Sequence, residues 1–105
     1  MKDVIWLGNS LDRVRSFPAS VREQIGRQLM ATQLGHEPWD CKPMPSIGPG
    51  VKEIRARTAA GAWRVFYIAK LDDAVYVLHA FSKKTQKTPK QDLEIARKRL
   101  AGIKR

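Results

Sequence analysis

The chain has 105 residues, 43% of them hydrophobic, which is enough for one domain with a single core that we expect to span residues 1–105. Its 20 Lys and Arg exceed its 10 Asp and Glu, and the net charge of +10 predicts an electronegative partner: a nucleic-acid backbone, an acidic protein or a membrane surface. The sequence has no signal-peptide pattern, no apolar run near the roughly 20 residues that span a bilayer, and only Cys41 as a thiol, so we expect a cytoplasmic protein.

A strand and two helices are predicted first. The apolar run at 4–7 predicts a short strand, and Ser10 is expected to cap a brief helix that Pro18 interrupts. Ser20 and Glu23 have the spacing of a capping box, which predicts the start of a second helix. A Leu-Gly pair ends that helix, and apolar and small polar residues at three- and four-residue steps form its buried stripe. The stripe consists of Val21, Ile25, Gln28, Leu29 and Thr32.

Three strand-like segments follow at 51–57, 63–71 and 74–81. Gly61 and Asp72-Asp73 mark the turns between them. Short turns between successive strands predict an antiparallel meander.

Two other segments surround these strands. Residues 36–50 contain four prolines and two glycines, which predicts an irregular connection of fixed shape. Pro89 opens a last helix at 90–103, whose buried stripe is Leu93, Ala96, Leu100 and Ile103. The predicted fold is therefore α+β, in the order β-α-α-β-β-β-α, with the meander sheet packed against the helices.

Charged residues gather on the predicted sheet. Alternation places Glu53, Arg55 and Arg57 on one face of their strand, with apolar residues between them. Arg64 is the only charge in an otherwise apolar strand segment, so it should lie in a cleft or in an ion pair. The segment 81–89 adds three lysines and a glutamine after the last strand. The sheet can bring these charges together in one basic patch.

No metal or cofactor is expected at this patch. His36, His79 and Cys41 form no cluster with metal-ligand spacing, and the glycines are not spaced to cradle phosphates ahead of a helix. The remaining chemistry is metal-free cleavage of RNA through its own 2′-hydroxyl, which needs a base, cations and an acid. Glu53 is the predicted base, Arg55 and Arg64 would hold the phosphate, and Lys84 would neutralise the leaving oxygen. The alternative is a solvated basic face with Glu53 in an ordinary cross-strand ion pair.

Two aromatic residues of the predicted strands have to be assigned to packing or to function. His79 is expected to share a face with Val75, Val77 and Phe81, where it is either a packed core residue or a general acid. Tyr67 alternates with apolar residues, and packing is its expected role.

The segments 51–57, 61–67 and 75–89 resemble the phage-derived, HigB-like branch of the RelE/ParE toxin superfamily. The resemblance rests on Glu-Ile-Arg, Arg-Val-Phe-Tyr and Lys-Lys-Thr-Gln-Lys-Thr, and it extends to the proline-rich segments 42–45 and 47–50. It implies a RelE-like α+β fold and the toxin of a type II toxin-antitoxin pair. Such toxins commonly cleave mRNA without a metal, often on the ribosome.

The resemblance also implies site residues and partners. Arg55, Arg64 and Lys84 match cleft cations, and Glu53 matches a position where some relatives carry a carboxylate base and others a lysine. The partners it implies are a cognate acidic helix-turn-helix antitoxin, mRNA and the ribosome, with neither a membrane nor a small-molecule cofactor. Further RNA contacts are expected from Arg57, His79, Lys83, Gln86 and Lys87.

The chain departs from the family pattern after its last strand. Many ribosome-dependent relatives carry a tyrosine there, whereas no aromatic residue follows Phe81 in this sequence. Acid catalysis would then come from His79 or Lys84. Two other functions fit the same residues: inhibition of DNA gyrase by binding, as in the ParE branch, and plain RNA binding.

Overall fold

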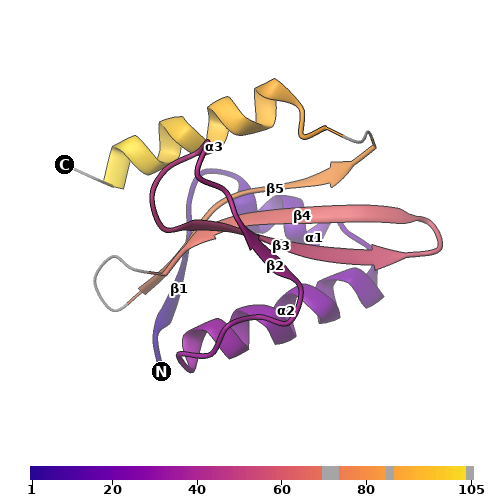
Figure 1. Cartoon of the computed structure of the whole chain (residues 1–105). Coiled ribbons are helices and arrows are strands. Elements are labelled where there is room, and N and C mark those ends of the chain that lie inside the picture. The colour runs from indigo at the N-terminus through magenta and orange to yellow at the C-terminus, as the bar shows by residue number, and fades with distance from the viewer. Residues whose placement is uncertain (70–73, 85–86, 104–105) are drawn as a thin grey trace.

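The computed structural model describes residues 1–69, 74–84 and 87–103, and its α+β fold has the elements seen in Figure 1. The end of the strand predicted at 63–71 and the turn predicted at Asp72-Asp73 lie outside these residues. One strand, β2, was not predicted, and all other expected elements are present. In chain order the elements are β1 (Asp3–Trp6), α1 (Ser10–Arg15), α2 (Ala19–Gln33), β2 (Cys41–Pro43), β3 (Val51–Thr58), β4 (Gly61–Ile68), β5 (Ala74–Lys83) and α3 (Lys90–Ile103).

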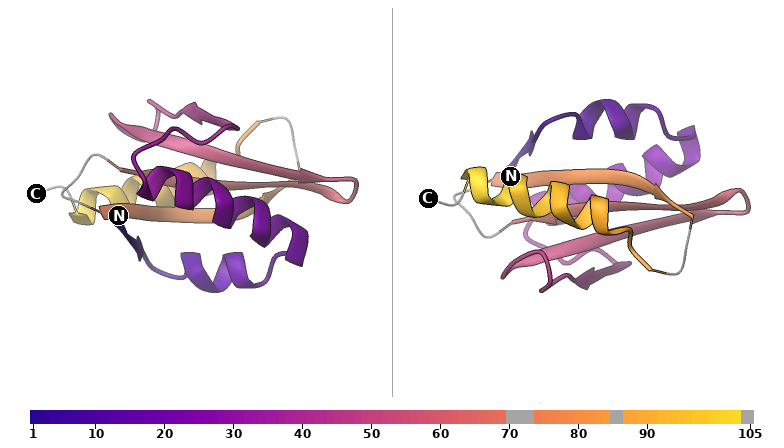
Figure 2. Two further views of the ribbon diagram at one scale, coloured as in Figure 1. Left: turned by 90° about the horizontal axis from the view of Figure 1, so that it is seen from below. Right: turned by 90° about the horizontal axis from the view of Figure 1, so that it is seen from above.

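The strands form a single five-stranded sheet in the order β1-β5-β4-β3-β2. The predicted meander of β3, β4 and β5 is confirmed as antiparallel, and β1 joins β5 in parallel. Helix α2 and helix α3 lie on opposite faces of the sheet, as the views from below and above show (Figure 2).

Each face of the sheet has its own hydrophobic core. The face under α1 and α2 packs residues of both helices against Ile54, Val65 and Val77. The face under α3 packs Leu100 against Phe66 and residues of the proline-rich loop. Because β3 alternates between these faces, Glu53, Arg55 and Arg57 share one face, as predicted, and it is the α3 side.

The five-residue stripe of the second helix is buried, as predicted. The two predicted helix caps are wrong. Asn9, rather than Ser10, precedes α1, and the buried Ser10 hydroxyl lies 3.4 Å from the Val77 carbonyl oxygen. Helix α2 begins at Ala19 after Pro18, so Ser20 is already helical and caps nothing. Pro18 occupies the N-cap position, where its carbonyl accepts from the Arg22 amide at 3.0 Å and no side chain caps the helix.

Side chains from the helices close the exposed edges of the sheet. Beyond β2, the amide group of Gln24 exchanges two hydrogen bonds with the backbone of Arg57. Gln28 donates to the Arg55 carbonyl at 2.9 Å and accepts from the Asp40 amide at 3.2 Å. These glutamines take the place of a neighbouring strand and leave the backbone groups paired.

At the opposite edge of the sheet, beyond the end of β1, two arginines pair backbone carbonyls of β5. Arg13 donates to the Ala80 carbonyl at 2.7 Å, and Arg99 donates to the Leu78 carbonyl at 2.9 Å. They come from α1 and α3, so a helix from each face of the sheet fastens to β5.

Replacing the buried Gln28 with methionine should lower the free energy of unfolding by about 1–2 kcal/mol, because two partly buried backbone groups lose their partners. Urea denaturation measures the change. The matched control is Gln91→Met on the exposed face of α3, where we expect a change within about 0.5 kcal/mol. Equal stabilities of the two variants would contradict the edge-closing role of Gln28.

The proline-rich connection contains more regular structure than predicted. Strand β2 pairs antiparallel with β3, with Lys42 opposite Glu53 and Pro43 opposite Lys52. Proline is tolerated here because β2 is an edge strand, where one side of the backbone has no ladder to complete. The rest of the loop lies against α3. A side-chain carbon added at Gly48 would stand 2.4 Å from a terminal methyl of Leu100, so the missing side chain lets Leu100 pack directly on the loop.

Candidate nucleic-acid interface

Strand register brings the predicted charges together at the β3–β4 turn end of the sheet. Arg55 is opposite Arg64, and Arg57 is opposite Ala62, which is in turn opposite Lys83. Arginine side chains of β3 and β4 and the lysine of β5 thus come from three neighbouring strands. Pairing of the meander strands therefore brings residues spread over about thirty sequence positions onto one surface.

An open groove of about 570 Å³ lies at this end of the sheet. All its charged lining residues are cations: Arg57, Arg64, Lys83 and Lys84. Thr58 and the small residues of the β3–β4 turn complete the lining. Such a groove provides hydrogen-bond donors and positive charge, and small turn residues leave room for a backbone to approach. We refer to it as the basic groove.

Arg64 is the most enclosed cation of the basic groove, with 8% of its surface exposed. Burial lowers the pKa of its guanidinium, Glu53 opposes this shift, and Arg55 and Arg57 add to it. An arginine remains charged despite such a shift. Its planar guanidinium presents paired N–H donors, referred to below as the fork, and this desolvated fork is suited to a phosphate. The prediction that this charge lies in a cleft or in an ion pair is confirmed, because it does both.

Glu53 lies beneath the cations and is fully buried. One of its oxygens, Oε1, is 3.4 Å from Arg64 Nε and 3.9 Å from Lys42 Nζ. Neither carboxylate oxygen has a hydrogen-bond partner within the described residues, and nor does Arg64 Nε. The structure therefore buries the predicted base, away from any ligand in the groove, and places it beside Arg64.

Arg55 is engaged elsewhere. Its Nε donates to Asp40 Oδ1 at 2.9 Å, its Nη2 forms an ion pair with the same oxygen at 2.8 Å, and it does not line the basic groove. The Arg55 backbone amide also donates to the Asp40 carbonyl. Its charge is thus largely compensated, and the expected pair of phosphate arginines is reduced to Arg64 in this structure.

The lysines of the basic groove differ in environment. Lys83 is half-buried, and its pKa is lowered by burial and then by Arg64, with Glu53 opposing the shift. Lys84 is exposed at the end of the strand. Lys87 is also exposed, though it does not line the groove, and Gln86 lies outside the described residues.

His79 is buried in the core, with 2% of its surface exposed, and does not line the basic groove. A register shift between β4 and β5 moves it away from the face of Val75 and Val77, so that part of the prediction is wrong. Its ring stacks on Phe81, and its Nε2 lies 2.6 Å from Asp92 Oδ1 on α3. The core alternative thus describes His79 in this structure.

The stability of the fold should fall as the pH is lowered below about 6.5, the ordinary pKa of histidine, because burial lowers the pKa of folded His79. Asp92 opposes this shift, and the nearby Arg13 and Arg99 reinforce it. Between the ordinary and the lowered pKa the unfolded chain binds more protons, so acid favours unfolding. Urea denaturation from pH 7.5 to 5 measures the effect.

The control for this pH dependence is His79→Gln, whose stability should fall less over the same pH range. An NMR titration of His79 checks the cause directly. A folded pKa at or above 6.5 would contradict the account.

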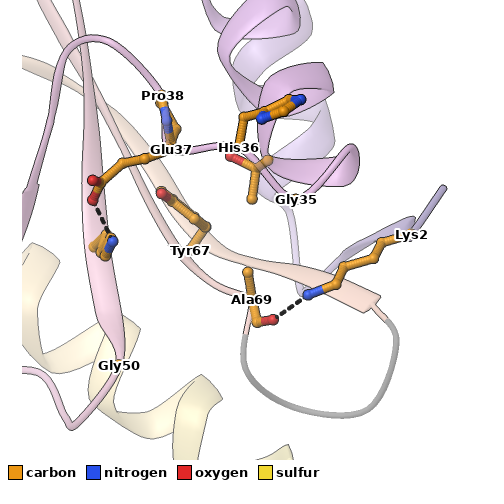
Figure 3. Close-up of a pocket in the computed structure, with 10 residues that line it drawn as sticks. Lys2, Gly35, His36, Glu37, Pro38, Gly50, Tyr67 and Ala69 are labelled. Carbon is orange, nitrogen blue, oxygen red and sulfur yellow. Dashed lines mark hydrogen bonds and ion pairs between the residues drawn. The ribbon is translucent and has the colours of Figure 1, made fainter.

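A second pocket, of about 240 Å³, lies at the other end of β3 and β4 (Figure 3). Its lysines already have partners: Lys2 donates to the Ala69 carbonyl at 2.8 Å, and Lys52 forms an ion pair with Glu37. Tyr67 contributes its ring but is 2% exposed, which confirms its predicted packing role. This pocket offers less free positive charge than the basic groove.

Asp40 and Lys42 were not predicted as parts of the site. Both belong to the proline-rich connection, and only the pairing of β2 with β3 brings them to Arg55 and Glu53. Within the described residues, His, Cys, Asp and Glu form no group of three that could hold a metal ion. No helix among those residues is both long and apolar enough to cross a membrane.

Comparison with known proteins gives one family. The family model described as "Phage derived protein Gp49-like (DUF891)" matches residues 12–101, which include α2, the whole meander and nearly all of α3. No curated protein matches the chain.

Proposed function

We propose that this chain, which belongs to the Gp49-like family of phage-derived proteins, is the toxin of a toxin-antitoxin pair and cleaves mRNA without a metal ion. The family is RelE-toxin-like, and the HigB-like resemblance of the sequence agrees with it. The observation that carries the nuclease proposal is the basic groove, whose charged lining residues are all cations. A groove of this kind favours a phosphodiester backbone as substrate.

The proposed reaction uses the 2′-hydroxyl of the RNA as nucleophile. Its oxygen forms a bond to phosphorus while the bond to the 5′-oxygen breaks, which leaves a 2′,3′-cyclic phosphate and a 5′-hydroxyl. Arg64 would hold the non-bridging oxygens and stabilise the charge that develops on them. Lys84 would neutralise the leaving 5′-oxygen from the edge of the groove.

Proton removal needs a group that the substrate can reach. Glu53 was the predicted base, but it is fully buried beneath Arg64. Lys83 lines the basic groove, and its lowered pKa increases the fraction that is neutral and able to accept a proton. Lys83 is therefore the better candidate for the base in this structure.

The charge of the chain also fits the proposed partners. A net charge of +10 favours rapid association with an acidic antitoxin of helix-turn-helix type and with the RNA-rich ribosome. The antitoxin would inhibit the toxin by covering or distorting the basic groove.

Inhibition of DNA gyrase by binding is the second candidate. It is favoured by one observation, namely that the predicted carboxylate base is inaccessible while the groove keeps cations that suffice for binding. The two functions stop growth through different targets.

Controlled expression of the protein, with growth recorded and transcript 5′ ends mapped, distinguishes them. New ends inside translated messages, appearing before any DNA damage, are the expected result. Growth arrest with intact transcripts and damaged DNA would contradict the nuclease and support gyrase inhibition.

A further inference from the structure

Glu53 has an environment that differs from that of a catalytic base. Its side chain is 0% exposed, and its two oxygens have no hydrogen-bond partner within the described residues. A buried charge without compensation is costly, so the cations around it are part of what keeps it there. Arg64 is the nearest of these, at 3.4 Å, and Lys42 follows at 3.9 Å.

The geometry of the contact assigns an orientation to Arg64. The guanidinium edge at Nε faces Glu53, while Nη1 lies 3.2 Å from the carbonyl of Trp63, its own neighbour in β4. Arg64 still lines the basic groove in this position. Contacts on the inner side of the planar group therefore leave its remaining donors for a ligand in the groove.

A second pair on the neighbouring strand follows the same arrangement. Asp40 holds Arg55 by two donors, at 2.9 and 2.8 Å, and Arg55 is opposite Arg64 in the register. Arg55 and Arg64 thus each have a carboxylate that restricts them. Only the Glu53 pair stands below the basic groove, since Arg55 does not line it.

We infer that Glu53 is a positioning residue, which holds the Arg64 fork in the orientation that binds an RNA phosphate, and that it is not the base. The inference rests on the proposed nucleic-acid function and deepens it. A fork needs orientation to bind in bidentate fashion, whereas a lysine is a point charge that does not. The effect of Glu53 should therefore depend on arginine at position 64.

A double-mutant cycle on binding tests this dependence. The probe is a fully 2′-O-methylated RNA oligonucleotide, which lacks the free 2′-hydroxyl that the proposed reaction needs. Glu53→Gln should weaken binding about tenfold in the wild-type background and less than about twofold in the Arg64→Lys background, the mark of two coupled residues. Glu94→Gln on exposed α3 changes the net charge equally and should leave the affinity unchanged.

Three results would overturn the positioning role. Equal losses in the two backgrounds would show that Glu53 acts independently of the fork. Unchanged binding by Glu53→Gln would show that the carboxylate does not contribute to phosphate binding, and tighter binding would show that it only repels the phosphate. A cleavage rate that drops with unchanged affinity, together with loss of the acidic limb of the pH–rate profile, would restore Glu53 as the base.

Two further safeguards keep the test decisive. Circular dichroism and urea denaturation check that each variant folds, and Glu53→Asp, which withdraws the carboxylate by one methylene, replaces Glu53→Gln in the cycle if the latter does not fold. If wild-type protein cuts no RNA, the proposed nuclease fails, whereas the binding cycle still decides whether Glu53 positions Arg64.

Discussion

Replacing Arg64 with lysine is expected to reduce the rate of RNA cleavage about 10- to 100-fold, and replacing it with methionine about 100- to 1000-fold. The guanidinium is the most enclosed cation of the basic groove, so its interaction with developing charge on the phosphate is weakly screened by water. Lysine keeps the charge but loses the fork, and methionine loses both. Single-turnover cleavage of a defined message measures the effect.

The matched control for methionine is Arg27→Met on the exposed face of α2, where the same charge is lost at a position that does not line the groove. Its cleavage rate should stay within about twofold of wild type. Methionine at position 64 also leaves Glu53 without its nearest cation, so its folding is checked by urea denaturation. Because the lysine variant retains this cation, a folded lysine variant with wild-type cleavage would contradict the role of Arg64.

Raising the salt concentration from 50 to 200 mM should weaken binding of single-stranded RNA about 50-fold. The four cations of the basic groove would each neutralise one phosphate, and for a single strand each such contact contributes about −0.7 to the slope of log affinity against log salt. A slope near −2.8 follows, and it gives the expected loss over a fourfold change in salt. Fluorescence anisotropy with a labelled oligonucleotide measures it.

Two variants connect this slope to the basic groove. Lys84→Met should make the slope shallower by about 0.7, because one phosphate contact is lost. Lys98→Met on the exposed surface of α3 removes an equal charge and should leave the slope as it is. If both variants change the slope equally, or neither does, RNA binds to the general positive surface and the groove has no special part in it.

Much of the fold could be predicted from local pattern. The helical spacing of the α2 stripe and the apolar strands of the meander identify their elements because each buries one continuous face. The prediction for α2 included Gln28, although the pattern did not show that its amide completes a sheet edge. The capping box predicted at Ser20 failed because α2 already begins at Ala19 after Pro18, and β2 was missed because prolines usually exclude a strand.

The site was predicted less completely than the fold. Alternation correctly placed Glu53, Arg55 and Arg57 on one face, since it depends only on the period of the strand. It could not show that Asp40 would engage Arg55, because that contact depends on how a distant loop pairs. Nor could it show the burial of Glu53 or the register shift at His79, which arise from packing between strands.

The most direct test of the central claim compares two copies of one message during translation in vitro with the purified protein. One copy is unmodified, and the other carries a single 2′-O-methyl group on the nucleotide preceding a mapped cut. The account predicts cleavage of the unmodified message, with a 2′,3′-cyclic phosphate and a 5′-hydroxyl at the new ends, and no cut at the methylated nucleotide. Cleavage at the methylated nucleotide, or no cleavage of either message by protein that inhibits gyrase, would contradict it.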